Sequence, residues 1–313
     1  MGNESRNLIS RSEAQRALLQ SGYLLETRLE THLQRSGYYV EANNSYPDPD
    51  TGKSRELDLY GMTAIKAGPR EQDFVFSVLL VECVNNPQPV ALITKEPQVP
   101  FLHHKDVKHA GLPVKFLTPE DRWESLPDYL GLDKFHHYCK GRIATQFCSF
   151  RTKRDQQQRE WMALHEEHHF DCFRKLCAAA DYFLDTHFKS WRFDGPEYVN
   201  IEFYYPVLVL QGELLEARPS RSAVQLVRKP HLQFRRSEFV RGEMRNYQID
   251  VITESYFPRF LALVEEESVR IARRLRRRHK EVQKVMDRIV RRARRLRSPE
   301  KIREALEYRE GFA

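Results

Sequence analysis

The sequence has few cysteines and lacks any long apolar run. Its five cysteines are odd in number and scattered, with no C-x-x-C pair, which argues against a disulfide framework. No stretch approaches the roughly 18 consecutive apolar residues that a membrane-spanning helix needs. The first residues, Met1 to Arg6, are polar and lack the apolar core of a signal peptide. We therefore expect a cytoplasmic protein with no membrane partner.

Internal repeats are also absent, and the only biased segment is rich in arginine. The 313 residues contain 41% apolar and 30% charged residues, a composition typical of a folded globular chain with ample material for a core.

Acidic residues are scarce in one part of the chain. Residues 268–297 contain fourteen Lys/Arg and only two acids, Glu281 and Asp287, so the rest of this +7 chain is slightly acidic. A localised positive field of this kind indicates nucleic acid as the first candidate partner.

Two short apolar runs each present an acid near their ends. The first, residues 55–61, alternates so that Glu56 and Asp58 are expected on one face of a strand, with Leu57 and Leu59 on the other. The second, residues 77–86, contains Glu82 after a continuous apolar stretch. If the two strands are neighbours, Asp58 and Glu82 converge. Buried carboxylates require a compensating cation, and hard oxygen ligands suit Mg²⁺ or Mn²⁺.

A helix is predicted directly before these strands. Leu25, Leu29 and Leu33 form a helical stripe that ends before Gly37, and Glu26 lies beside the stripe. The order helix, glycine-aromatic, hairpin, acidic strand and second acidic strand resembles the core of the PD-(D/E)xK, or restriction-endonuclease-like, nuclease superfamily. The resemblance covers about the first third of the chain.

The resemblance implies roles for individual residues. Glu26, Asp58 and Glu82 would be catalytic, and Asp58, Glu82 and the Cys83 carbonyl would hold Mg²⁺ or Mn²⁺. One position departs from the family pattern, because Val84 replaces the lysine that orients and activates the attacking water. Lys53 and Lys95 are the candidate substitutes.

The expected fold class is α/β, with a restriction-endonuclease-like mixed sheet flanked by helices, a helical insertion and a long basic C-terminal helix. We divide the chain into a first part of the nuclease-like core (1–118), a helical insertion (119–195), a β-rich part (196–256) and the basic helix (257–313). The β-rich part is expected to rejoin the core sheet, and a separate small domain is the alternative.

The basic helix carries two further interpretations. The residues expected to contact nucleic-acid phosphates, with DNA favoured over RNA, are Arg273, Arg274, Arg277, Arg278, Lys280, Arg291, Arg292 and Arg295. The same helix has apolar residues stepping by four and three between residues 275 and 296, a heptad pattern typical of a homodimer seam or of a protein partner.

A second motif, His165-Glu166-Glu167-His168-His169, satisfies the H-E-x-x-H pattern of zinc peptidases. Charged residues occupy its two inner positions, and no third ligand follows at a recognisable spacing. His136, His137, Cys139 and Cys148 have no spacing typical of a zinc site.

Two functions follow from these patterns. The first is a metal-dependent endonuclease that hydrolyses phosphodiesters, with genome defence or repair as the setting that the resemblance implies. The alternative is a pseudo-nuclease that has lost catalysis at Val84 and serves as a nucleic-acid-binding or complex-assembly subunit. A zinc peptidase is a remote third.

Overall fold

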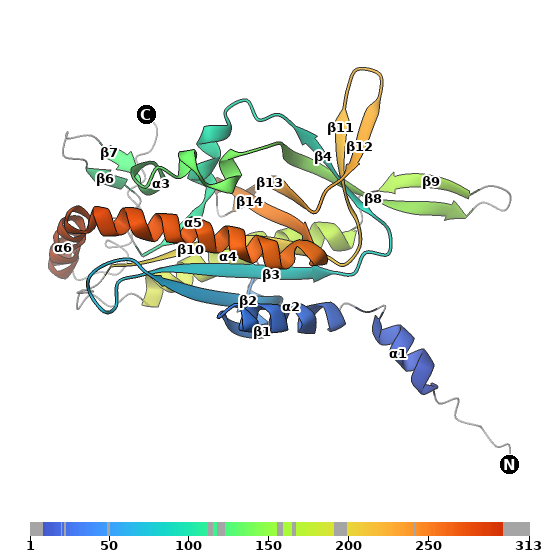
Figure 1. The fold of residues 1–313 in the computed structure, drawn as a ribbon, viewed down its shortest axis with the longest axis horizontal. Coiled ribbons are helices and arrows are strands. Elements are labelled where there is room, and N and C mark those ends of the chain that lie inside the picture. Colours follow the sequence, from blue (N-terminus) through green and yellow to red (C-terminus); the bar gives the residue numbers. More distant parts are fainter. Residues whose placement is uncertain are drawn as a thin grey trace, which may run out of the picture.

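The computed structural model describes residues 9–19, 21, 23–48, 51–111, 115–117, 123–154, 159–164, 167–190, 199–240 and 242–296. It is a mixed α/β structure in which helices flank a large mixed sheet (Figure 1).

The strands, in chain order, are β1 (Tyr39–Pro47), β2 (Ser54–Lys66), β3 (Phe74–Val84), β4 (Val90–Lys95), β5 (Lys108–Ala110), β6 (Lys115–Leu117), β7 (Trp123–Ser125), β8 (Ile143–Arg154), β9 (Arg159–Leu164), β10 (Asn200–Leu210), β11 (Leu214–Pro219), β12 (Val224–Arg228), β13 (His231–Val240) and β14 (Glu243–Thr253). The helices are α1 (Arg11–Leu19), α2 (Tyr23–Arg35), α3 (Leu126–Tyr129), α4 (Glu167–Ser190), α5 (Phe257–Arg277) and α6 (His279–Leu296), with short 3₁₀ turns η1 (Pro100–Asp106), η2 (Leu132–Lys134), η3 (His137–Cys139) and η4 (Glu254–Tyr256).

The main sheet has the strand order β1-β2-β3-β10-β14-β13-β8-β4-β11-β12, with β5 added beside β10 and β9 beside β8. Its centre is three parallel strands, since β10 pairs in parallel with both β3 and β14. β10 is paired with β3 along its whole length, so strands from the first third and the last third of the chain form one sheet. Parallel strands that are covered on both faces have sequences of nearly continuous apolar residues, and the sequences of β3 and β10 are of this kind.

Each face of the sheet has its own core. α2 and α5 cover one face and α4 covers the other, as Figure 1 shows with α5 in front of the sheet and α4 behind it. The stripe predicted on α2 is confirmed, because Leu25, Leu29 and Leu33 are fully buried against the sheet. Successive residues of β3 alternate between the two cores, Leu79 and Val81 facing α5, and Leu80 facing α4.

The prediction of a helical insertion over 119–195 is correct for α4 and for the short α3, η2 and η3, but not for the residues between η3 and α4. Residues 143–154 and 159–164 are strands, and β8 pairs with β4 and β13 inside the main sheet. Along β8 the buried residues Phe147 and Ser149 alternate with more exposed ones, which is the period of a strand and not of a helix.

The prediction of one continuous basic helix is wrong. α5 ends at Arg277 and α6 begins at His279, with Arg278 in a non-helical conformation between them. Leu275 and Val282 are buried in this chain's own core, and His279 bonds to Asp73. Leu275, His279 and Val282 of the expected dimer seam are therefore already occupied within the chain. The side chains of its other members, Met286, Ile289, Ala293 and Leu296, lie outside the described residues.

Candidate functional site

The strand β2 changes faces at Asp58. Leu57 lies in the core beneath α4, whereas Leu59, two residues later, lies in the core beneath α2 and α5. Regular alternation would put both leucines on one side, so the expectation that they share a face is wrong. Asn43, on the neighbouring strand at this level, has a positive φ of 54°, which marks the same local twist.

This twist brings Asp58 to the end of β3. The backbone N–H of Cys83 donates a hydrogen bond to Asp58 Oδ2 at 2.7 Å. The Asp58 carboxylate therefore adjoins the residue that follows Glu82, and the sequence-predicted convergence of these two acids is present.

Glu82 is the most deeply buried member of the group, with 1% of its surface exposed. It faces α4, where Lys175 Nζ lies 2.8 Å from Glu82 Oε2. Glu82 Oε1 has no hydrogen-bond partner among the residues that the structure describes. An unsatisfied buried carboxylate oxygen is costly, and it leaves one coordinating atom open at this site.

Glu26 completes the acidic group from α2. It is partly buried, and its charge interacts with Asp58, Glu56 and Lys175. Burial, reinforced by Asp58 and Glu56, raises the pKa of Glu26 above its ordinary value. Burial and the Asp58 carboxylate also raise the pKa of Glu82 to about 8, although Lys175 lowers it. These three acids repel one another enough that protons, or a cation, are needed to balance them.

The lysine of this site was not predicted from the sequence. Lys53 is exposed beside the turn before β2 and Lys95 is exposed on β4, and the lysine that contacts Glu82 is neither of them. Lys175 instead reaches Glu82 from α4, 93 residues further along the chain. Burial lowers the pKa of Lys175, but Glu82 outweighs this and raises it above the ordinary value, so the ammonium stays charged. Val84 is buried in the core and only packs.

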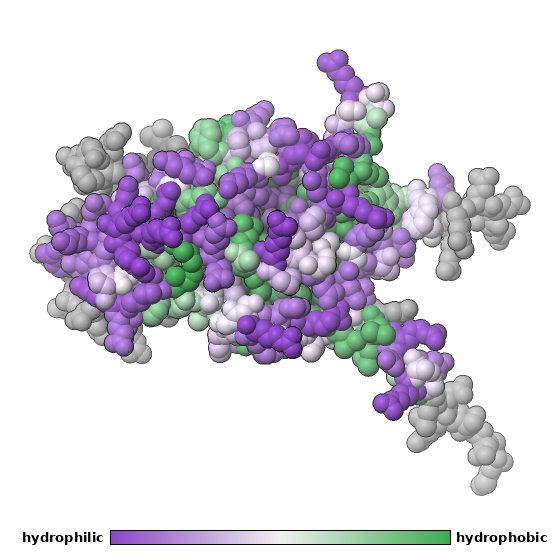
Figure 2. All heavy atoms as spheres, viewed as in Figure 1, coloured by the Kyte–Doolittle hydropathy of each residue, from purple (hydrophilic) through white to green (hydrophobic). Residues whose placement is uncertain are grey.

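The arginine-rich segment lies at the opposite end of β3. Arg276 donates to the carbonyl oxygen of Lys66 at 2.9 Å, and Lys66 pairs with Phe74, the first residue of β3. At about 3.3 Å per residue, the strand from Phe74 to Glu82 spans about 26 Å. Figure 2 shows hydrophilic residues gathered over this end of the molecule, where α5 is followed by α6.

Three of the predicted phosphate contacts have intramolecular partners, one of them Arg291, which donates to the Asp287 carbonyl of its own helix at 3.1 Å. Arg274 donates to the carbonyl oxygens of Leu130 and Gly131, and its guanidinium lies 4.7 Å from the ring centroid of Phe135. Arg278 donates to the Tyr129 carbonyl at 2.8 Å. Arg274 and Arg278 satisfy the carbonyl groups that end α3.

The other basic side chains divide into two groups. Those that are exposed on α5 and α6 are Arg273, Arg277 and Lys280, and Arg291 is exposed as well. The side chains of Arg292 and Arg295 lie outside the described residues.

A cleft of about 750 Å³ opens at the carboxyl ends of the parallel strands, which is the edge that also carries Glu82. It is lined by residues from α2, the β10–β11 turn, the β12–β13 turn and the start of α5, and its cationic members are Arg228 and Lys229. Open α/β sheets bind ligands at this edge.

The H-E-x-x-H motif falls outside the described residues, as do the side chains of 167–169. The part of the chain that the structure describes contains no helix long and apolar enough to cross a membrane.

No protein-family model matches this chain, and no curated protein or solved structure shows a significant match to it.

Proposed function

We propose that this protein is a metal-dependent phosphodiester hydrolase acting on nucleic acid, built on a restriction-endonuclease-like arrangement in which Lys175 replaces the missing motif lysine. The observation that carries the proposal is the 2.8 Å contact between Lys175 Nζ and Glu82 Oε2, beside Asp58 at the end of two neighbouring strands.

The donor set suits a hard divalent cation. Asp58 and Glu82 offer carboxylate oxygens, the Cys83 carbonyl is adjacent, and Glu82 Oε1 is an unpartnered buried acceptor. Mg²⁺ or Mn²⁺ bound there would lower the pKa of a water and stabilise charge on the scissile phosphate.

The chain's own residues supply positioning. The Cys83 N–H fixes the orientation of Asp58, and Lys175 holds Glu82 from the side of α4. The Lys175 ammonium lies where it could donate to the attacking water or to a phosphate oxygen. Glu26, at the start of α2, adds a third carboxylate whose raised pKa suits it to proton transfer.

The arginine-rich end is then a second nucleic-acid contact, distinct from the cutting site. A duplex advances ~3.4 Å per base pair, so 26 Å corresponds to about eight base pairs. A duplex that touched both regions would bridge the two ends of β3 around the outside of the helices that cover it.

The test is cleavage of circular plasmid and of single-stranded DNA and RNA with Mg²⁺ or Mn²⁺. Asp58→Asn and Glu82→Gln should each abolish cleavage. The matched control is Glu216→Gln, because Glu216 is an equally buried strand glutamate, 2% exposed and bonded to Thr94 and Arg218 on the other side of the sheet. This variant should cleave normally.

The same experiment separates the two functional hypotheses. Salt-sensitive binding without cleavage by the unsubstituted protein would support the pseudo-nuclease, in which the Lys175–Glu82 pair is structural. Neither cleavage nor binding would contradict both.

A further inference from the structure

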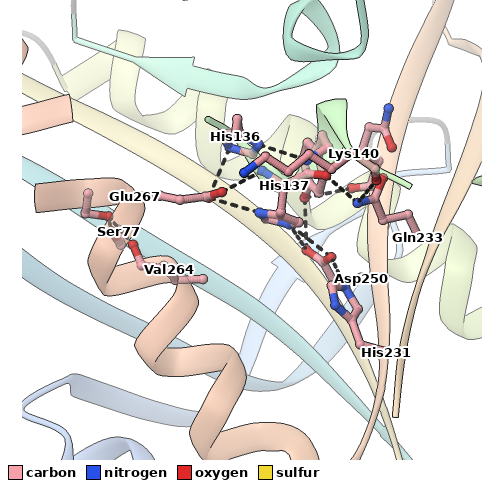
Figure 3. A network of polar contacts seen from close by, with 12 residues as sticks. Ser77, His136, His137, Lys140, His231, Gln233, Asp250, Val264 and Glu267 are labelled. Atoms are coloured by element: carbon pink, nitrogen blue, oxygen red, sulfur yellow. Dashed lines mark hydrogen bonds and ion pairs between the residues drawn. The ribbon is translucent and has the colours of Figure 1, made fainter. Parts of the chain in front are cut away.

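A buried polar network lies on the other face of the sheet from Glu82. His137 is at its centre, between Asp250 of β14 and Glu267 of α5 (Figure 3). His137 Nδ1 is 2.9 Å from Glu267 Oε2, and Nε2 is 3.0 Å from Asp250 Oδ1. His231 Nε2 lies 2.7 Å from the same Asp250 oxygen. The network joins η3, β13, β14 and α5.

The network holds two buried carboxylates among its histidines. Asp250 and Glu267 are 0% and 2% exposed, and each lies within hydrogen-bond distance of His137. Two buried negative charges are costly unless two positive charges balance them. Protonation of both His137 and His231 would supply these charges, and so would one divalent cation with neutral histidines.

We propose that His137 Nε2, His231 Nε2 and Asp250 form a binding site for a divalent transition metal, with Zn²⁺ as the reference ion. The three ligand atoms lie within 4.8 Å of one another. Metal bonds of about 2.1 Å at angles of 90–110° place neighbouring donors about 3 Å apart. The two contacts to Asp250 Oδ1, 2.7 and 3.0 Å, are near this spacing.

Glu267 has the geometry of a supporting carboxylate. Ligating histidines usually donate their second ring N–H to a carboxylate that fixes the tautomer. The Glu267 carboxylate accepts from His137 Nδ1 and, at 2.6 Å, from the His137 backbone N–H. Metal binding would displace the protons that His137 Nε2 and His231 Nε2 direct at Asp250. His137 would release its Nε2 proton to solvent and keep its Nδ1–H hydrogen-bonded to Glu267, and His231 would carry its remaining proton on Nδ1.

The adjacent trio of His136, His137 and Glu267 is a poorer site, although its donor atoms are equally close. His136 Nδ1 accepts a hydrogen bond from the Tyr138 backbone N–H at 3.2 Å. The neutral ring therefore carries its proton on Nε2, the nitrogen that faces Glu267 at 3.6 Å, and has no lone pair for a metal there.

The metal site is separate from the acidic site. Asp250 pairs with Val207, which pairs with Val81, so Asp250 lies on β14 two strand steps from β3, about 10 Å. Asp250 faces α5, whereas Glu82 faces α4. We therefore expect the bound metal to tie α5 and the 132–139 segment to the sheet and not to act on nucleic acid.

The experiment is Zn²⁺ titration of chelator-treated protein by calorimetry, with Co²⁺ as the optical reporter and the melting temperature as a second readout. With excess Mg²⁺ present to occupy the proposed Asp58–Glu82 site, the unsubstituted protein should bind one Zn²⁺ tightly and melt at a higher temperature with it. His231→Gln should weaken binding at least 100-fold and remove the thermal shift.

The matched control is His279→Gln. His279 is a comparable histidine, 13% exposed and 2.8 Å from the buried Asp73, against 15% and 2.7 Å for His231 and Asp250. It should bind Zn²⁺ normally. Glu267→Gln should weaken binding about 10- to 100-fold without removing it, as expected of a positioning residue.

Three outcomes would overturn the proposal. They are no Zn²⁺ binding by the unsubstituted protein, normal binding by His231→Gln, and loss of binding in His165→Gln, which would assign the metal to the H-E-x-x-H motif instead.

Discussion

Lys175 Nζ on α4 lies 2.8 Å from Glu82 Oε2 near the end of β3, although 93 residues separate the two in the chain. Glu82 is buried, whereas Lys175 is partly exposed, with 29% of its side chain accessible. The pair thus joins a buried carboxylate to a cation that solvent or a substrate can reach. This geometry gives the acidic site a lysine that its own strand lacks.

Lys175→Met should reduce cleavage about 10²- to 10⁴-fold, the range typical of losing a general acid–base group, with little change in substrate affinity. Lys53→Met and Lys95→Met are the controls, since both lysines are exposed and have no contact with Glu82. Single-turnover cleavage and filter binding measure the two effects. Cleavage by Lys175→Met at the normal rate would remove the lysine from the mechanism.

Glu82 makes the metal-free protein less stable as the pH rises. Its pKa is about 8 when folded, against an ordinary value of 4.5. Between these values the folded protein holds a proton that the unfolded chain has released, so stability falls as the pH increases. In Glu82→Gln the melting temperature should decline less between pH 5 and pH 8, with chelator present. An unchanged slope would contradict a protonated Glu82.

Two groups of basic residues should contribute differently to nucleic-acid binding, those of the arginine-rich segment and those of the cleft, which Glu213 and Glu254 also line. Charge reversal at Arg273 and Arg277 should weaken binding and reduce its dependence on salt. Fewer phosphates are then neutralised, so fewer counterions are released when the protein binds. Cleavage of substrate that is still bound should continue. Charge reversal at Arg228 and Lys229, in the cleft at the carboxyl edge, should lower cleavage as well. Gel shifts at several salt concentrations, paired with single-turnover rates, distinguish these effects; identical behaviour of both variants would argue against two separate surfaces.

Arg274 should matter for stability more than for binding. Arg274→Ala removes the guanidinium donor from the carbonyl groups of Leu130 and Gly131, of which Gly131 keeps the Lys134 N–H, and should cost about 1–3 kcal/mol of unfolding free energy. The neighbouring Arg277 is exposed, and Arg277→Ala should change stability by no more than about 0.5 kcal/mol. Urea unfolding measures both. Equal stabilities would mean that the Arg274 contacts contribute nothing.

The sequence alone was sufficient to predict the helices and strands whose apolar residues recur at a regular spacing. The stripe of Leu25, Leu29 and Leu33 predicts α2, and the apolar runs around Glu82 and in 200–210 predict the central strands, because side-chain spacing alone decides which faces can be buried. Asp58 and Glu82 lie on two strands that follow each other in the chain. Their proximity therefore requires only that these two strands pair with each other.

Tertiary structure decided the remainder. A heptad pattern reads the same whether a helix is continuous or broken, so only packing against Asp73 and the core shows that the chain turns at Arg278. The strand β13 and the insertion strands β8 and β9 were not recognised, because short alternating segments with many charges have weak signals.

The contacts that define both candidate sites come from distant parts of the chain. Lys175 meets Glu82 across 93 residues, and His137 meets Asp250 across 113. Composition and spacing fixed which residue types were available for chemistry. Which of them meet was decided by the pairing of β3 with β10 and β14 and by the packing of α4 and α5 on opposite faces, since only the folded sheet brings these segments within bonding distance.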